Sequence, residues 1–327
     1  PKRFDHLIYQ GPQIWIANAF FQETNEAAKT HRDYDVISTE GVGSQFIPRT
    51  RYQVAKPWPE YLAGYPQWAG RPSNDYYRVA WRRRLDTNME RTVISCLLPP
   101  GPCHVHQMVT AHLTDNRTTA VLSGFLSSLT VDFLIRTANF GDLVMGVLGV
   151  VPFLRDSPLH DYLLHRVLLL NCLTANFAEL WEEVFSPAWR NDGWVPGVGG
   201  ALRPHTELDA VESVWTESTP LRRQADRRRA AIEIDAIVDV ALGLSVEQSL
   251  AIYRAQFPVL QRYEREALYD VNGRQLPGKL ASDYRKGKLK PADCTMDGVT
   301  YVEPFVGVDR ERDIELAHKH FSDLVQG

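Results

Sequence analysis

Three arginines alternate within the β-type stretch YYRVAWRRRL, at Arg78, Arg82 and Arg84. Side chains alternate between the two faces of a strand, so these arginines would share one face and the apolar residues between them the other. Residues two apart on that face lie roughly 6.6 Å apart along the strand, close to the spacing of phosphates. Because guanidinium groups bind phosphate oxygens and guanine edges, the pattern predicts a DNA-contacting surface. The alternative is exposed salt bridges to acids such as Asp75 and Asp86.

Further cations extend this candidate DNA surface. They are Arg49 and Arg51 in a second β-type run, His104 and His106 in a third, and Arg222 and Arg223 at the start of a basic segment. Residues 222–229 would wrap around a helix, so one part could hold the DNA backbone while another pairs with acids of a catalytic domain. A solvated helix with local pairs such as Arg222 to Asp226 is the alternative. Residues 279–290 are also basic and rich in lysine.

Other chemistry has weaker support in the sequence. Cys103, His104, His106 and His112 lie close together, but no Asp or Glu stands at ligand spacing, so we expect no metal site. The string GRQLPGK resembles a phosphate-binding loop but lacks the following Ser or Thr and a preceding apolar strand. No carboxylate cluster has the spacing of a nuclease, and we expect no catalytic residue in this chain.

Composition narrows the class of protein. The chain has 327 residues, 44% of them hydrophobic, which favours about two domains with substantial cores. Its net charge of −4 argues against general coating of nucleic acid and favours binding at one basic face. Four dispersed cysteines are typical of buried thiols in a reducing cytosol. The longest uncharged apolar run is too short for a bilayer and no signal peptide is visible, so we expect a cytoplasmic protein without a membrane partner. The first residue is proline, which suggests a fragment or a processed chain.

The expected architecture is α+β, with a β-rich target-recognition lobe over residues 1–155 and a mainly helical lobe with a C-terminal extension over residues 156–327. The expected strands cover residues 13–21, 46–54, 76–85, 91–98, 103–109 and 142–151. The expected helices cover residues 118–136, 159–185, 220–243, 246–257 and the stretch after Asp309. Residues 56–72 are an aromatic loop that either packs on the sheet or forms a stacking platform. Residues 186–206 form a connection rich in proline and glycine.

A series of strings carries a resemblance to a known family. They are GPQIWIAN, IPRTRY, YYRVAWRRR, ERTVISCLLPPGP, SSLTVDFLIR, VPF, LLLNCLTANFAELWEE, EIDAIVDVALGLS, QFPVLQRYE, YDVNGR and PFVGVDRERDIELAH. In this order the chain, from about Gly11 to Phe321, resembles the C-terminal target-recognition region of large adenine-specific DNA methyltransferases. These include the single-chain type IIG restriction-modification enzymes and relatives in the BREX and DISARM phage-defence systems.

The resemblance implies sequence-specific binding of double-stranded DNA for an adenine-N6 methyltransferase. It implies that an N-terminal methyltransferase domain, in the same or a separate chain, binds S-adenosylmethionine and flips the target adenine. The N-P-P-Y tetrapeptide and the glycine-rich cofactor loop of that chemistry are absent from this sequence. We therefore expect this chain to bind DNA, to hold no cofactor and to be inactive alone. We also expect other defence proteins among its partners. The rival hypothesis is a helical protein-interaction scaffold within a defence complex, without direct DNA readout.

Overall fold

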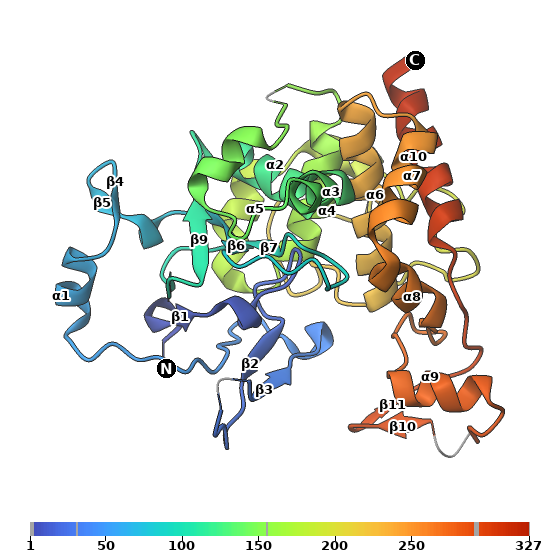
Figure 1. Cartoon of the computed structure of the whole chain (residues 1–327), viewed down its shortest axis with the longest axis horizontal. Coiled ribbons are helices and arrows are strands. Elements are labelled where there is room, and N and C mark those ends of the chain that lie inside the picture. The colour runs from blue at the N-terminus through green and yellow to red at the C-terminus, as the bar shows by residue number, and fades with distance from the viewer. Residues whose placement is uncertain (1–2, 31, 155, 291–293, 327) are drawn as a thin grey trace.

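The computed structural model describes residues 3–30, 32–154, 156–290 and 294–326. Helices dominate, and the strands are short, so the α+β prediction is confirmed. A body of helices fills the upper right of Figure 1 and the central sheet lies to its left; the segment 58–72 projects at the far left, and the segments 22–24, 34–36 and 278–285 lie at the bottom.

The central sheet has the order β7–β6–β9, with all pairs antiparallel. Its strands are β6 (Arg78–Arg82), β7 (Ser95–Leu98) and β9 (Met108–Ala111). In β6, Val79 pairs with Leu97 of β7 on one side and with Ala111 of β9 on the other. Helix α2 packs against the sheet, and the first four residues of β6 are all buried. Both faces of the sheet are therefore covered.

Two helices replace the single helix expected over residues 118–136. Helix α2 (Asn116–Ser127) begins after Asp115, whose side chain accepts a hydrogen bond from the Thr118 amide. Ser128 ends α2 in an extended conformation and caps α3 (Leu129–Thr137) by accepting from the Val131 amide. The two helices are bent by 65° at this break. A serine that caps a helix satisfies its free N–H groups and so favours a new start.

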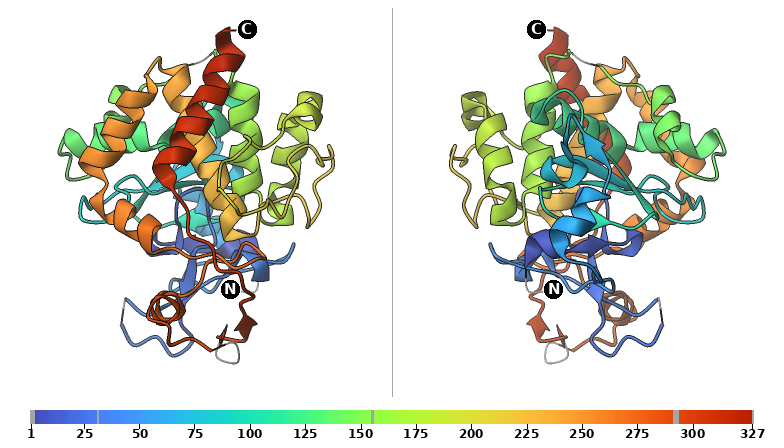
Figure 2. Two further views of the ribbon diagram at one scale, coloured as in Figure 1. Left: turned by 90° about the vertical axis from the view of Figure 1, so that its right-hand side faces the viewer. Right: turned by 90° about the vertical axis from the view of Figure 1, so that its left-hand side faces the viewer.

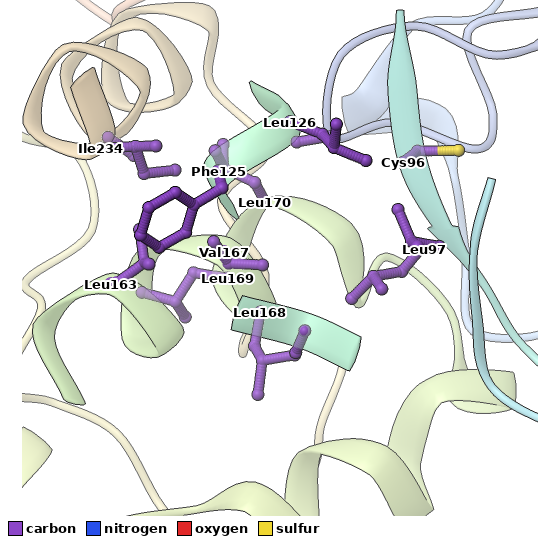
Figure 3. Packing of buried hydrophobic residues seen from close by; sticks show 14 of the residues in the cluster. Cys96, Leu97, Phe125, Leu126, Leu163, Val167, Leu168, Leu169, Leu170 and Ile234 are labelled. Carbon is purple, nitrogen blue, oxygen red and sulfur yellow. The ribbon is translucent and has the colours of Figure 1, made fainter. Parts of the chain in front are cut away.

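Helix α6 (Gln224–Ala241) is the centre of the helical body. It packs against α2, α4 (His160–Asn171) and α10 (Arg310–Gln326). Where α2 meets α4, a Cβ on Gly124 would come within 2.8 Å of Leu163 Cδ1, so glycine permits this close approach. Figure 3 shows the apolar packing of α2, α4, α6 and β7 around Phe125, and its labelled side chains are buried.

The remaining elements are short. The helices are α1 (Trp58–Ala63), α5 (Ala178–Val184), α7 (Val246–Gln256), α8 (Pro258–Glu266) and α9 (Gly278–Arg285). The strands are β1 (Ile8–Tyr9), β2 (Gln22–Thr24), β3 (Tyr34–Val36), β4 (Gln67–Trp68), β5 (Arg71–Pro72), β8 (Cys103–His104), β10 (Thr295–Met296) and β11 (Val299–Thr300). β1 pairs in parallel with β8, and the other three pairs are hairpins.

Three expected strands are wrong. Residues 13–21 fold back on themselves at Ala17, which has a positive φ of 51°, and the Asn18 side chain accepts from the Phe20 amide. Residues 46–54 lie outside the strands: Arg49 O accepts from the Thr24 amide, but the Arg49 amide binds the Glu23 carboxylate, so no regular backbone ladder forms. In place of the strand expected over residues 142–151, residues 145–150 form a 3-10 helix.

The long helix expected over residues 159–185 also ends early, at Asn171. The Asn171 side chain donates to Val167 O and accepts from the Leu97 amide, which joins the helix end to the sheet. Helix α5 then resumes at Ala178.

One hydrophobic cluster runs from Leu7 to Phe321 and draws on both sides of residue 155, so the two predicted lobes share a core. A smaller cluster around Leu276 and Phe305 lies under α9. All four cysteines are buried, as expected. In the described part of the chain, no single helix is long and apolar enough to cross a membrane; α2 and α3 together meet that test by length and composition only.

Asp239, on α6, is a buried acid whose neighbours are mainly neutral. It accepts a hydrogen bond from the Thr130 hydroxyl, and Asp235 is the nearby charge that further disfavours its ionisation. Burial is the main cause that raises the pKa of Asp239 from its usual 3.8 to about 7. The folded state therefore holds this proton at pH values where the unfolded chain has released it.

We expect the contribution of Asp239 to the free energy of unfolding to fall as pH rises from about 4 to 7, with a slope of at most about 1.4 kcal/mol per pH unit. The variant Asp239→Asn remains neutral, so its stability relative to wild type should increase over that range. Urea unfolding at pH 5 and pH 7 measures this, with the exposed Asp323→Asn as control. A stability difference for Asp239→Asn that is equal at both pH values would contradict the assignment.

Candidate nucleic-acid interface

Arg78, the first of the predicted DNA-binding arginines, is fully buried. Its Nη2 donates to Pro102 O at 2.7 Å and to Pro99 O at 3.3 Å, so it braces the turn that leads into β8. Burial lowers the pKa of its guanidinium. The prediction that Arg78 faces DNA is therefore wrong, because both faces of the sheet are covered.

Arg82 points to the same side of β6 and meets the N-terminal segment that covers it. Nε donates to Gly11 O at 2.8 Å and Nη2 to Ile14 O at 2.7 Å, and the guanidinium lies 5.1 Å from the centre of the Trp15 ring. Burial lowers its pKa to about 10. Arg84 lies beyond the end of β6 and is 88% exposed, with its nearest carboxylate, that of Asp142, 3.9 Å away. Of these three arginines, only Arg84 faces solvent.

Arg49 and Arg51 lie beside the β2–β3 hairpin. Arg49 forms ion pairs with Glu23 at 2.6 Å and Asp35 at 2.9 Å, so acids of the hairpin neutralise its charge. Arg51 donates to the backbone oxygen of Thr30. Both arginines therefore support the hairpin.

The two predicted histidines have different surroundings. His104 is largely buried, with Nε2 at 3.1 Å from Thr110 Oγ1 and Nδ1 at 3.1 Å from Val105 O. Burial, aided by Arg78, lowers its pKa to about 4, so the ring is neutral at pH 7. His106 is exposed and contacts the guanidinium of Arg83, which also pairs with Asp142 at 3.0 Å. Only His106 is available to a ligand at the surface.

Arg222 and Arg223 precede α6 and join distant parts of the chain. Arg222 donates to Thr39 O and Leu173 O, both at 3.1 Å, and Arg223 pairs with Glu40. Neither predicted role, at the DNA backbone or in a pair with Asp226, matches these contacts. Asp226 instead accepts from the backbone amides of residues 205 and 206.

The alternative of exposed salt bridges fits only Arg84, whose ion pair is with Asp142 at 3.9 Å. Among the residues that the structure describes, no ion pair joins Arg78, Arg82 or Arg84 to Asp75 or Asp86. Main-chain carbonyls bind Arg78, Arg82 and Arg222 instead. The same part of the chain contains no group of three or more His, Cys, Asp or Glu that could hold a metal ion.

The structure presents a different basic surface, which we call the lysine segment, residues 279–290. It comprises α9 and the loop after it and carries five cations and one acid. The exposed cations are Lys279, Arg285, Lys286, Lys288 and Lys290. Within the described ranges, none of the four lysines lies within ion-pair distance of a carboxylate. The clustering of lysines was the sequence signal for this surface, since lysine is rarely buried.

The base of the lysine segment is held rigidly. Tyr269 bridges to both Gln275 and Val306, and the buried Asp270 carboxylate accepts from the backbone amides of Asn272, Arg274 and Val302. Asn272 and Gly273 form a turn, with φ +72° at the glycine. Arg274 pairs with Glu40 at 2.9 Å and so joins this region to the N-terminal segment that contains Glu40.

The lysine segment projects from the same end of the molecule as the β2–β3 hairpin (Figures 1 and 2). Lys29 and Arg32, in the loop of that hairpin, are also exposed. Arg285 Nη2 donates to Glu266 O at 2.6 Å and anchors the end of α9 to α8. Cations from two separate parts of the sequence thus lie at one end.

Arg78 and Arg84 give a test of the assignment of buried and exposed arginines. Arg78→Ala would create a cavity and would leave the carbonyls of Pro99 and Pro102 without their donor. We therefore expect a loss of about 2–4 kcal/mol in the free energy of unfolding. Arg84→Ala, at an exposed position, should change it by less than about 0.5 kcal/mol. Urea unfolding compares the two variants. Equal small effects would show that Arg78 is not a structural residue.

Comparisons with known proteins give no match to this chain: no family model, no curated protein and no solved structure. The candidate DNA-binding residues are therefore the exposed cations of the lysine segment and, at the end of the central sheet, the exposed Arg84 and His106.

Proposed function

We propose that this chain binds double-stranded DNA as the specificity module of an S-adenosylmethionine-dependent adenine-N6 methyltransferase, in a restriction-modification or anti-phage defence system. The observation that carries the DNA-binding part is the lysine segment, whose exposed lysines lack carboxylate partners in the described structure. The order of the sequence strings given above supports the methyltransferase part.

The lysine segment has the chemistry of a phosphate-binding surface. Each ammonium carries three donors on a flexible stem and binds phosphate as a point charge. Lysines that neutralise phosphates release counterions from DNA, which makes the affinity depend on salt. Since the whole chain has a net charge of −4, such binding would be confined to this end of the molecule.

Base reading requires side chains that reach the groove edges. Arg84 can offer a paired donor to guanine, because its guanidinium is almost fully exposed. The exposed His106 beside Arg83 offers a second contact. Methyl transfer belongs in this proposal to the N-terminal methyltransferase domain, which would bind S-adenosylmethionine.

A protein-interaction scaffold is the second candidate function. The observation that favours it is the use of most predicted DNA-binding residues in internal contacts, including Arg49, Arg78, Arg82 and Arg222. A scaffold has no reason to bind duplex DNA with a steep salt dependence, so the two functions can be distinguished.

The test replaces the four lysines of the lysine segment with glutamine at positions 279, 286, 288 and 290. Fluorescence anisotropy with a random-sequence duplex across a salt series measures the slope of log affinity against log salt. We expect this slope to fall by about two to four units, because each phosphate contact contributes about 0.9.

The matched control removes four exposed cations elsewhere: Lys56→Gln, Arg203→Gln, Arg312→Gln and Lys319→Gln. It changes the net charge by the same amount and should leave the slope nearly unchanged. Equal losses in both variants would contradict a local DNA face. Absence of salt-dependent binding by wild type would favour the scaffold.

A further inference from the structure

A cavity of about 470 Å³ lies between the N-terminal segment and the helical body, and Tyr269 and Gln275, at the base of the lysine segment, also line it. The turn around Trp15 and the residues after β3 form one side, and α6 and α8 form the other. This volume is in the range of sites for small organic ligands. Its lining is mainly apolar, with Ile37, Ile234 and Leu260 among the wall residues.

Arg227 is the unusual cation of this wall. Its Nη1 donates to Leu170 O and Leu221 O, both at 2.9 Å, and its Nη2 donates to Ala17 O at 3.1 Å. The backbone oxygens hold the guanidinium in place but do not neutralise its charge. Of its five N–H donors, the one on Nε and one on Nη2 remain without a partner in the described structure.

The other arginines of the wall are all neutralised. Arg91 pairs with Asp132 at 2.8 Å, Arg228 with Glu264 at 2.7 Å and Arg310 with Asp235 at 2.8 Å. Arg227 forms no ion pair within the described residues, and burial together with the neighbouring Arg222 lowers its pKa to about 10. Arg227 is partly buried and held only by neutral carbonyl oxygens, so an anionic ligand at this position would be stabilised.

Glu90 restricts what else the cavity can accept. Its largely buried carboxyl lines the cavity, and burial raises its pKa. A second acidic group on the ligand would meet this carboxyl and the Glu264 carboxylate. The wall therefore suits one acidic group at Arg227 and an uncharged body elsewhere.

We propose that this cavity is a binding site for a small organic anion, in which one acidic group meets Arg227 and an aromatic or aliphatic body fills the apolar wall. Arg227 and the apolar wall are not part of the DNA surface proposed above. The bound anion would contact both the turn at Ala17 and α6. It would therefore strengthen the connection that Arg227 of α6 already makes to Ala17.

The test uses two probes that differ by one acidic group. 1-Anilinonaphthalene-8-sulfonate carries a sulfonate on an aromatic body, and N-phenyl-1-naphthylamine has the same body without it. Fluorescence titration should show one sulfonate probe bound per folded chain. Arg227→Met should weaken the sulfonate probe at least tenfold and leave the neutral probe within about twofold.

Two further variants keep the test decisive if Arg227→Met is poorly folded. Ala231, on the cavity wall, allows Ala231→Phe to fill the space, which should remove binding of both probes. Glu90→Gln removes a negative charge and should tighten the sulfonate probe at least threefold without affecting the neutral one. Circular dichroism verifies folding of each variant. Absence of one-to-one binding by wild type, or equal effects of Glu90→Gln on both probes, would overturn the proposal.

Discussion

Ion pairs between buried arginines and buried acids join the central helices of this structure. Arg166, at the centre, is fully buried between α4 and α6 and pairs with Glu233 and Asp192, each at 2.6 Å. His165 completes the group, with Nδ1 2.7 Å from Asp192 and its ring stacked on Trp189. Removing one partner from such a group would leave a buried charge uncompensated, which is strongly destabilising. The position of α6 relative to α4 is therefore fixed by charge as well as by apolar packing.

The same rule operates along the other side of α6. Arg228 and Arg310 share the Glu264 carboxylate, and each has a second acid, Asp313 for Arg228 and Asp235 for Arg310. These pairs join α6, α8 and α10. Arginine suits such positions because its planar fork keeps its charge when buried and binds two partners at once. The basic segment of the sequence is thus mostly part of the interior.

Local signals in the sequence predicted the parts of the fold that depend on local interactions. The Ser245–Gln248 capping box begins α7, and Asp309 accepts from the Arg312 amide at the start of α10. The break at Ser128 was missed because apolar spacing continues across it, while the cap is a single side chain. The false strand over residues 13–21 has strand composition, but a turn at Ala17 and contacts to Arg82 decide its path.

The candidate site was harder to predict for a related reason. The alternation of side chains along a strand correctly placed Arg78 and Arg82 on one face of β6. It cannot show whether another segment covers that face. Gly11 and Ile14 accept from Arg82 across about 70 residues of sequence, and such contacts have no local signal. The lysine segment could be recognised in the sequence from its high content of lysine. Its exposure follows from lysine's strong hydration, which favours solvent over buried ion pairs.

In the proposed function most arginines hold the interior together, while the lysine segment and Arg84 contact DNA. Lysine acetylation in the presence and absence of a duplex, read by mass spectrometry, would test this division directly. We expect the duplex to protect the four lysines of the lysine segment, while Lys56 and Lys319 stay reactive. Bound protein whose lysine segment stays reactive, or uniform protection of all lysines, would contradict it.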